Sequence, residues 1–340
     1  MDVYHAAAVL QYRAAACSEL TMKILVTGAA GFIGSHAAED LLNQGHCVVG
    51  LDNFDPFYNR ADKQRNLTPL LDREEFLFVE ADICDSAAMD ELFQTAGPFE
   101  AILHLAARAG VRPSIADPLG CQRANITGTM ALLGRSVAQD RRPKFLFASS
   151  SSVYGNNPKV PFSETDPVDN PISPYAATKK AGELICHTYH HLYRMPVFCL
   201  RFFTVYGPRQ RPDLAIAKFA RNILAGEPIE MYGDGTTSRD YTYIDDIVAG
   251  VRRAVERCDG YEIINLGSNH PITLKDMIAT VAAACGRESE IKQMPMQPGD
   301  VDRTFADVEK AARLLDYAPT TPFDQGVARQ VEWLRGVMRA

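Results

Sequence analysis

From Met22 onward, short apolar or β-branched runs alternate with longer amphipathic runs, and this alternation limits the possible folds more than any other feature. The pattern is typical of parallel strands joined by crossover helices. It predicts an α/β fold with a parallel sheet flanked by helices. The expected strands span 23–27, 47–51, 76–80, 101–105, 144–149 and 197–202, and the expected helices span about 32–44, 85–95, 117–139 and 174–193.

The pattern of alternating strand-like and helix-like runs changes after Thr204. The segments YGPRQRPD and YGDGTTSRD interrupt the alternation, and shorter elements follow up to a C-terminal helix that carries Trp333. This change predicts a smaller α/β lobe that is partly interleaved with the first. We expect a first domain of 22–205 plus about 240–268 and a second lobe of about 206–239 plus 269–340. Residues 1–21 are expected to be an N-terminal extension, either disordered or the product of a misassigned upstream start.

Charge and cysteine usage narrow the class of protein. The formal net charge of -7 gives no electrostatic reason to expect a nucleic-acid or anionic-membrane partner. The eight cysteines are scattered without a CxxC pair, as is usual for reduced intracellular thiols, and no metal site is expected. The chain has no long apolar stretch and its first residues make a poor secretory signal, so a cytoplasmic protein is predicted.

The segment LVTGAAGFIGSH places Gly28, Gly31 and Gly34 between the first expected strand and the first expected helix. Glycines at this point let the backbone turn tightly and approach a pyrophosphate at the helix N-terminus. A glycine triplet alone would be equally consistent with an ordinary turn. Asp52 follows the second strand, where a carboxylate accepts hydrogen bonds from a ribose diol and repels a 2′-phosphate. The combination predicts a dinucleotide site that favours NAD over NADP.

Two later segments fall on the same expected edge of the sheet. Asp82 in VEADI and the small residues Ala106 and Ala107 in HLAA follow the third and fourth strands. They are predicted to border the adenine and the pyrophosphate, although each alone would be consistent with a helix cap or a packing residue.

The segment SPYAATKKAGE places Tyr175 and Lys179 one helical turn apart, on the same face of an expected helix. A phenol is a poor base at its usual pKa of about 10, but a nearby cation favours the phenolate. A positively charged nicotinamide ring would add to that effect. The alternative is a chance pair on an exposed helix, and the preceding dinucleotide site and serine-rich strand end favour the catalytic interpretation.

These motifs together resemble the extended short-chain dehydrogenase/reductase family, within its nucleotide-sugar epimerases and dehydratases, from Met22 to near the C-terminus. The resemblance implies a Rossmann-type doubly wound sheet that binds NAD and a smaller C-terminal lobe that binds a nucleoside-diphosphate sugar. It also implies a homodimer formed through paired helices. By position, those helices are the ones near 117–139 and 174–193.

The resemblance also implies roles for particular residues. Tyr175 matches the catalytic base, Lys179 its partner on the nicotinamide ribose, and Ser150 the residue that hydrogen-bonds the 4-hydroxyl of the sugar. Asn125 in NITGT matches an asparagine that supports the active site in many members. The expected cofactor contacts are Gly28, Gly31, Phe32, Ile33, Gly34, Asp52, Asn53, Asp82, Ile83, Leu105, Ala106, Ala107, Asn125, Ser149, Tyr175, Lys179 and Phe202.

The residues after Ser150 bear on which reaction follows. Members of the family first oxidise the sugar at C4 to a 4-keto sugar, with NAD as the hydride acceptor. Dehydratases of the family then use Asp and Glu directly after the catalytic Thr, and UDP-glucuronate decarboxylases use a Glu two places after it. This chain has Ser151 and Ser152 there, and neither hydroxyl is an acid or base at neutral pH. Simple 4-epimerisation is therefore predicted.

The segment RFFTVYGPRQRPD places Thr204 where UDP-glucose 4-epimerases of the family usually have Asn. With the serine run, GDGTTSRDYTYIDDIV and MQPGDV, it resembles the UDP-glucuronate 4-epimerase subgroup. We expect Ser150, Ser151, Ser152 and Thr204 to face the sugar, with the charge of Arg211 nearby. The alternative for Thr204 is a β-branched residue that ends a strand.

The uridine diphosphate is expected in the second lobe. Arg239 in SRDY resembles the family's pyrophosphate-binding arginine, and Asp300 in QPGD its uridine-ribose acid. Gln297 stands where glucose epimerases often have an arginine, and Arg303 is a candidate for that charge. Ile229, Met231 and Tyr232 are expected to wall the uracil, although such a stripe also suits a core. His187, His190 and His191 are read as surface or dimer-contact residues.

The main prediction is thus an NAD-dependent UDP-glucuronate 4-epimerase, an isomerase. UDP-glucose 4-epimerase is the same-class alternative, and UDP-glucuronate decarboxylase is more remote. A non-catalytic NAD-binding protein is the alternative from another class, and the intact set of Ser150, Tyr175 and Lys179 argues against it.

Overall fold

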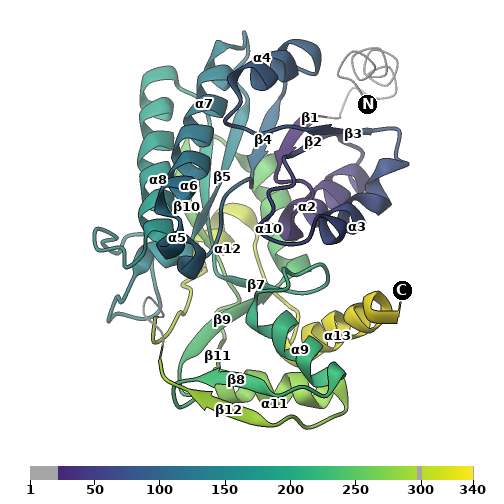
Figure 1. The fold of residues 1–340 in the computed structure, drawn as a ribbon. Coiled ribbons are helices and arrows are strands. Elements are labelled where there is room, and N and C mark those ends of the chain that lie inside the picture. Colours follow the sequence, from purple (N-terminus) through teal and green to yellow (C-terminus); the bar gives the residue numbers. More distant parts are fainter. Residues whose placement is uncertain (1–21, 297–300, 340) are drawn as a thin grey trace.

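The structure is a computed structural model, and it describes residues 22–296 and 301–339 (Figure 1). Its central sheet has seven strands in the order β10-β6-β5-β4-β1-β2-β3, and every neighbouring pair is parallel. The predicted Rossmann-type doubly wound sheet is confirmed. The strands are β1 (Lys23–Thr27), β2 (Cys47–Asp52), β3 (Phe76–Glu80), β4 (Ala101–His104), β5 (Lys144–Ser150), β6 (Val197–Phe202) and β10 (Tyr261–Leu266).

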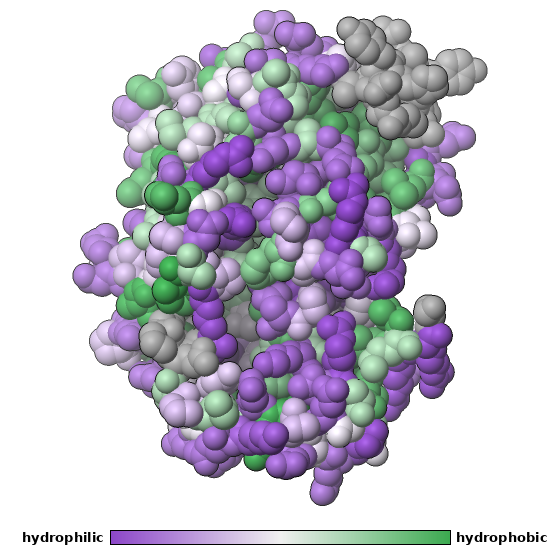
Figure 2. Space-filling view, viewed as in Figure 1, coloured by the Kyte–Doolittle hydropathy of each residue, from purple (hydrophilic) through white to green (hydrophobic). Residues whose placement is uncertain are grey.

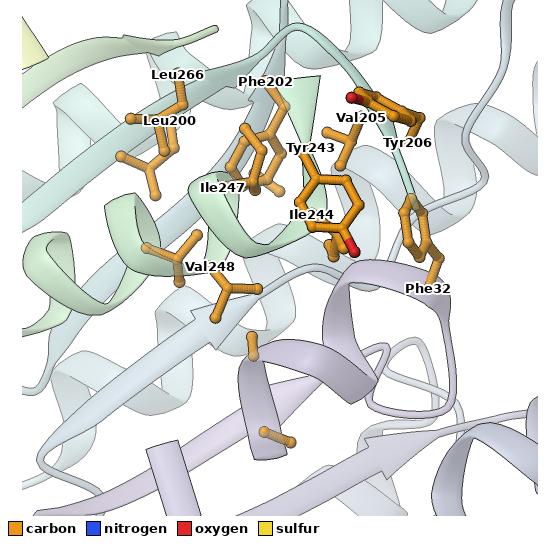
Figure 3. Packing of buried hydrophobic residues seen from close by; sticks show 14 of the residues in the cluster. Phe32, Leu200, Phe202, Val205, Tyr206, Tyr243, Ile244, Ile247, Val248 and Leu266 are labelled. Carbon is orange, nitrogen blue, oxygen red and sulfur yellow. The ribbon is translucent and has the colours of Figure 1, made fainter. Parts of the chain in front are cut away.

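Successive side chains of each strand point to opposite faces of the sheet, so apolar strands build two cores. Ile24 and Val26 of β1 pack into one core with α2 (Phe32–Asn43), α3 (Arg60–Leu71) and α10 (Ile244–Arg257). Leu25, between them, packs into the other core with α4 (Ser86–Thr95), α7 (Thr129–Ala138) and α8 (Pro174–Tyr193). Figure 3 shows the first core, where Ile247 of α10 lies close to Phe202 of β6. Helices therefore cover both faces, as the alternation of the sequence predicts.

Six of these strands begin and end within one residue of their predicted bounds, but the helices differ more. The expected helix over 117–139 is divided into α6 (Pro118–Gln122), a π-helical turn η2 (Arg123–Gly128) and α7. Helix α3 was not predicted, because its residues are mostly polar and include Pro69 near its end. The π-helical turn widens the backbone at Asn125, and such turns occur often at functional sites.

The second group of elements lies below the large sheet in Figure 1. It contains a three-stranded sheet of β11 (Pro271–Thr273), β9 (Ser238–Tyr243) and β7 (Thr204–Tyr206), and a parallel pair of β12 (Ile291–Met294) and β8 (Ile229–Tyr232). The helices α9 (Ala215–Ala225), α11 (Leu274–Cys285) and α13 (Phe323–Arg339) pack with them. We propose that this group is the second lobe; it matches the predicted ranges of about 206–239 and 269–340 except that β7 and β9 extend into the ranges predicted for the first domain.

The remaining elements are three short helical segments. The chain returns to the large sheet at β10, and α12 (Glu309–Leu315) packs near it. Before that, α5 (Val111–Ala116) follows β4, and a short 3-10 turn, η3 (Ser151–Tyr154), follows β5. Within the ranges that the structure describes, none of the helices combines the length and the apolar composition that a membrane crossing needs.

Candidate active site

A cavity of about 690 Å³ lies at the carboxyl ends of the central strands. In sheets of this type, ligands bind at that edge, near the point where the strand order reverses between β1 and β4. All the residues predicted to contact the cofactor line this cavity except Asn125. The predicted substrate residues Ser150, Ser151, Ser152, Thr204 and Arg211 line it as well. One cavity thus joins the two sites that the sequence predicts.

The glycine loop brings distant segments into close approach. Gly28 has a φ of 74°, and a Cβ added to it would lie 2.9 Å from the backbone nitrogen of Ala106. A Cβ on Gly34 would lie 2.0 Å from the carbonyl oxygen of Gly28. Gly31 precedes α2 without a side chain to cap it. Gly31, Phe32, Ile33 and Gly34 line the cavity, so the N-terminus of α2 lies at its wall, as the diphosphate of a dinucleotide requires.

Asp52 lies at the end of β2 with its carboxylate held in place. It accepts hydrogen bonds from the backbone N–H groups of Ala30 (3.2 Å) and Phe54 (2.8 Å). The ammonium of Lys63 lies 3.6 Å from its Oδ1 atom, and both side chains are nearly buried. A fixed carboxylate beside the glycine loop fits a ribose diol, as the sequence predicts.

Tyr175 and Lys179 lie in the first turns of α8, whose N-cap is Ser173. Lys179 is buried, and its Nζ donates to the carbonyl oxygen of Ala148, 2.6 Å away. The Nζ atom lies 5.8 Å from the centroid of the Tyr175 ring. Burial lowers the pKa of Lys179 to about 8, because desolvation disfavours the ammonium.

The sequence predicts that a nearby cation favours the phenolate of Tyr175, but the pKa of Tyr175 is raised. Burial raises the pKa of Tyr175, while its hydrogen bond with Ser150 and the charge of Arg211 lower it. The expected effect of Lys179 is not among the causes of this shift. In the protein alone, desolvation therefore exceeds the effect of the cations, and the phenol remains protonated at neutral pH.

The serine run divides into distinct positions. Ser149 is buried and donates to the carboxylate of Glu183, 2.7 Å away. Ser150 accepts from the backbone N–H of Ser152 (3.2 Å) and donates to its hydroxyl (3.1 Å). Ser151 and Ser152 begin η3 and are half-buried at the cavity wall. The turn presents hydroxyl groups to the cavity directly after the serine beside Tyr175.

Arg211 reaches the cavity, but its charge is not isolated. Its guanidinium donates to both carboxylate oxygens of Asp213, at 3.0 and 2.6 Å, and to the carbonyl oxygen of Ala109 at 3.2 Å. Thr204, the first residue of β7, also lines the cavity. The site therefore contains a paired arginine and a hydroxyl near the serine turn.

The remaining predicted substrate residues lie away from the cavity wall. Ile229 is fully buried in the core, so it has no surface open to a ligand and the predicted uracil contact is not supported there. Met231 is on the same face of β8 and is 8% exposed. The Tyr232 ring contacts the guanidinium of Arg112, 5.0 Å from the centroid. These roles were predicted from a short apolar stripe, which suits a core equally well.

Other predicted residues of the uridine site have different surroundings. Arg239 in β9 donates to the carbonyl oxygen of Ser238 at 2.9 Å. Arg303 donates to the carbonyl oxygen of Pro158 at 2.8 Å. Gln297 and Asp300 lie outside the described residues.

Asn125 supports the site from behind the cavity wall. Its side chain accepts from the backbone N–H of Arg108 (2.8 Å) and donates to the hydroxyl of Thr178 (3.0 Å). It is 2% exposed, so the predicted direct contact with the cofactor is not supported. It instead fixes η2 against α8 and the loop after β4.

Several residues of the cavity wall were not predicted from the sequence. Those with charged or aromatic side chains include Asp55, Phe57, Tyr58, Lys63, Arg108 and Arg123. Four of them lie between β2 and the first half of α3, where the polar segment DPFYNRADK has no apolar periodicity. Arg123 donates to the carboxylate of Asp82 at 3.1 Å, which ties η2 to the loop after β3.

Comparisons with known proteins agree with this geometry. A family model described as GDP-mannose 4,6 dehydratase matches residues 25–330. The probable UDP-glucuronate 4-epimerase of Rhizobium meliloti (strain 1021) is 42% identical over 332 residues, which cover 92% of this chain and 96% of that protein. The UDP-glucuronate 4-epimerase of Thermodesulfobacterium geofontis (strain OPF15) is 42% identical over 311 residues, which cover 91% of this chain and 95% of that protein.

Solved structures resemble the chain over nearly its whole length. The crystal structure of the Bacillus cereus UDP-glucuronic acid 4-epimerase, in complex with UDP-glucuronic acid and NAD, has a TM-score of 0.87 and 37% identity. The match covers 93% of this chain and 100% of that one. The Thermotoga maritima UDP-glucose 4-epimerase with UDP-glucose has a TM-score of 0.85 and 34% identity, over 93% of this chain and 100% of that one.

Proposed function

The chain belongs to the nucleotide-sugar epimerase branch of the extended short-chain dehydrogenase/reductase family, and we propose that it converts UDP-glucuronate to UDP-galacturonate. It is an isomerase that carries out the NAD-dependent 4-epimerisation of a UDP-sugar. The observation that carries the choice of sugar is the hydroxyl-rich turn at Ser150–Ser152, beside Tyr175 and in one cavity with Thr204 and Arg211.

We propose that Tyr175 acts as the base on the 4-hydroxyl of the sugar. Its hydrogen bond with Ser150 forms a short path from the sugar hydroxyl to the phenol. When bound, NAD accepts the hydride from C4 and later returns it to the other face of the ring. The ammonium of Lys179 lies at the same cavity, and its hydrogen bond to the carbonyl oxygen of Ala148 fixes the position of its charge. Its proposed role is to bind the nicotinamide ribose.

The absence of carboxylates after Ser150 separates epimerisation from the other reactions of the family. The matched family model is named after a dehydratase, yet the fold alone does not specify the reaction. Dehydration needs an acid at C6 and a base at C5, and Ser151 and Ser152 supply neither. A keto group at C4 of glucuronate also makes a β-keto acid, which loses CO₂ when its carboxylate is aligned with the ketone.

We propose that the hydroxyls of Ser151, Ser152 and Thr204 hold this carboxylate out of that alignment. The guanidinium of Arg211 adds a positive potential near this carboxylate. Its charge is partly neutralised by the ion pair with Asp213. The uridine diphosphate is proposed to contact Arg239, Gln297 and Asp300 in the second lobe. The roles of Ser151, Ser152, Thr204 and Arg211 rest on the shared cavity, and those of Arg239, Gln297 and Asp300 rest on the resemblance.

We expect the purified enzyme to convert UDP-glucuronate to UDP-galacturonate at least about tenfold faster than it converts UDP-glucose, since sites that hydrogen-bond a substrate group discriminate against its absence. Sugar proton NMR of each substrate incubated separately measures both conversions. A Thr204→Val variant, which keeps the shape but removes the hydroxyl, should lose activity on UDP-glucuronate and keep its activity on UDP-glucose. Conversion of UDP-glucose alone would contradict the proposal, and release of CO₂ with a pentose product would identify a decarboxylase.

We also propose that the enzyme is a homodimer that pairs through α6, α7 and α8. Leu119, Met130, Leu184 and Leu192 are exposed on these helices, with Leu119 78% exposed. Figure 2 shows several apolar side chains along the edge where Figure 1 places α6 and α8, on an otherwise largely hydrophilic face. Clustered apolar groups on a surface of this kind mark protein contacts. A cytoplasmic location is proposed as well, because six of the seven described cysteines are free thiols, whereas Cys47 is disulfide-bonded.

A Leu184→Glu substitution is expected to weaken such a dimer by about 100-fold, because it buries a charge at the contact. Sedimentation velocity over a concentration series measures the change. Leu71→Glu, at an exposed leucine of α3 on the other side of the sheet, is the matched control and should leave the dimer intact. A wild-type enzyme that sediments as a monomer would contradict the proposal.

A further inference from the structure

The segment 204–211, TVYGPRQR, carries a proposed sugar contact at each end. Thr204 and Val205 at its start and Arg211 at its end line the cavity. The residues between them make their side-chain and backbone hydrogen bonds to helices α2 and α13. The positions of Thr204 and Arg211 at the cavity therefore depend on what holds the middle of this segment.

Two buried glutamines join the segment to α13. Gln330 of α13 is 1% exposed and Gln210 is 6% exposed. The Nε2 atom of Gln330 donates to Oε1 of Gln210 at 2.7 Å, and its Oε1 atom accepts from the backbone N–H of Gly207 at 3.0 Å. Gln210 also donates to the carbonyl oxygen of Val205 at 2.9 Å and accepts from the backbone N–H of Ala217 at 3.1 Å. These backbone partners fix the orientation of both amides, because a flipped amide would place two donors or two acceptors together.

Close packing reinforces this connection. The hydroxyl of Tyr206 donates to the carbonyl oxygen of Phe323 at 3.2 Å. A Cβ added to Gly326 of α13 would lie 2.3 Å from that hydroxyl oxygen, so the helix reaches the segment only because a glycine stands there. Gly207 has a φ of 142°, and a Cβ on it would lie 2.5 Å from the Cγ2 atom of Ile244. The backbone of the segment therefore lies directly against α13 and α10.

Helix α2 holds the segment at the next two residues. The Nε2 atom of His36 donates to the carbonyl oxygen of Pro208 at 3.0 Å, and Arg209 donates to the carboxylate of Glu39 at 2.7 Å. Arg209 has a φ of 63°, in the left-handed region that residues with a side chain rarely adopt. A strained backbone of this kind persists where the surrounding contacts impose it. The contacts with α2 and α13 thus set the path of the chain between Thr204 and Arg211.

We propose that Gln330 is a positioning residue for the choice of sugar, and that it acts through Gln210 and Gly207 on Thr204 and Arg211. Gln330 is buried and is not part of the cavity wall in the described chain, so its effect must pass through the segment. The inference rests on the proposed function, in which Thr204 and Arg211 face the carboxylate of the sugar. A shift of these two residues should impair UDP-glucuronate more than UDP-glucose, because UDP-glucose carries an uncharged hydroxyl at C6.

A Gln330→Met variant keeps the length of the side chain and removes both hydrogen-bonding groups. We expect its kcat/KM to fall about tenfold for UDP-glucuronate, the effect of about one hydrogen bond, and to change less than about twofold for UDP-glucose. Sugar proton NMR at saturating NAD measures both rates. Gln139→Met is the matched control, because Gln139 bonds the backbone of Phe99 away from the cavity and should leave the ratio of the two substrates unchanged.

Double variants test whether Gln330 acts through the segment. The loss caused by Gln330→Met should be smaller in a Thr204→Val or an Arg211→Met background, because coupled residues are not additive. Full additivity in both backgrounds would overturn the inference. If Gln330→Met does not fold, Gln330→Glu keeps the acceptor for Gly207, removes the donor to Gln210 and is expected to change the ratio in the same direction.

An unchanged substrate ratio in the folded variant would overturn the inference, and so would an equal loss on both substrates, which indicates a general defect. These results leave the proposed function standing, because that function is judged by the preference of the wild-type enzyme for UDP-glucuronate. A wild-type enzyme without this preference would contradict the proposed function itself.

Discussion

A Tyr175→Phe variant is expected to bind NAD and to lose at least about a thousandfold in turnover, within the range for removal of a general base. The hydroxyl is the only part removed, and the ring keeps its place above Lys179. Burial keeps the pKa of Tyr175 above its ordinary value in the protein alone, so proton removal depends on Ser150, Arg211 and the bound cofactor. The chemical step should therefore fail while the cavity stays intact.

Proton NMR of UDP-glucuronate with enzyme at saturating NAD measures the turnover, and calorimetry measures NAD binding. Tyr189→Phe, on the same helix but away from the cavity, is the matched control and should keep full activity. Near-normal activity of Tyr175→Phe would remove Tyr175 from the base role. Loss of NAD binding together with turnover would instead indicate a folding defect.

An Arg201→Met substitution is expected to lower the free energy of unfolding by about 3 to 5 kcal/mol, as for other buried ion pairs that lose one partner. Arg201 and Glu183 are each 1% exposed. Arg201 donates from Nε and Nη2 to the two carboxylate oxygens of Glu183, at 2.7 and 2.9 Å, and from Nη1 to the Tyr154 hydroxyl at 2.9 Å. Removing the guanidinium leaves the buried carboxylate of Glu183 with the Ser149 hydroxyl and with Lys180, whose Nζ lies 3.7 Å away, as its remaining partners.

Urea unfolding followed by circular dichroism measures this loss. A double variant, Glu183→Leu with Arg201→Met, removes both charges and should recover part of the stability, because the cost of an unpaired charge is absent. Arg65→Met breaks an exposed pair with Asp62 and is the control, with an expected change of about 0 to 1 kcal/mol. An Arg201→Met loss no larger than that of Arg65→Met would contradict the argument.

The buried pair also connects stability to the active site. Glu183 accepts from the Ser149 hydroxyl, and Arg201 holds Tyr154 at the end of η3. The serine turn is therefore anchored at both ends by one ion pair. Glu183 lies in the same segment, SPYAATKKAGE, as Tyr175 and Lys179. The segment that carries the proposed catalytic residues therefore also carries a residue that supports the serine turn.

Local patterns in the sequence were sufficient to predict six of the seven strands of the central sheet, the glycine loop and the Tyr175–Lys179 pair. Strand alternation and four-residue helical spacing are properties of neighbouring residues, so they can be read without knowing the fold. The carboxyl-end rule then placed Asp52, Asp82 and Ala106 on one edge. This is why nearly all predicted cofactor residues line one cavity.

Tertiary packing alone decided the rest. Asn125 lies in a π-helical turn and bonds Arg108 and Thr178 behind the cavity wall, and no local pattern predicts that turn. The apolar run at Ile229 became core because α9 and α11 cover it. The 53–59 loop entered the site through contacts with Arg108 and Arg211, which come from distant parts of the chain. Such contacts depend on which surfaces the fold brings together, so local sequence determined the catalytic chemistry and long-range packing determined the shape of the cavity around it.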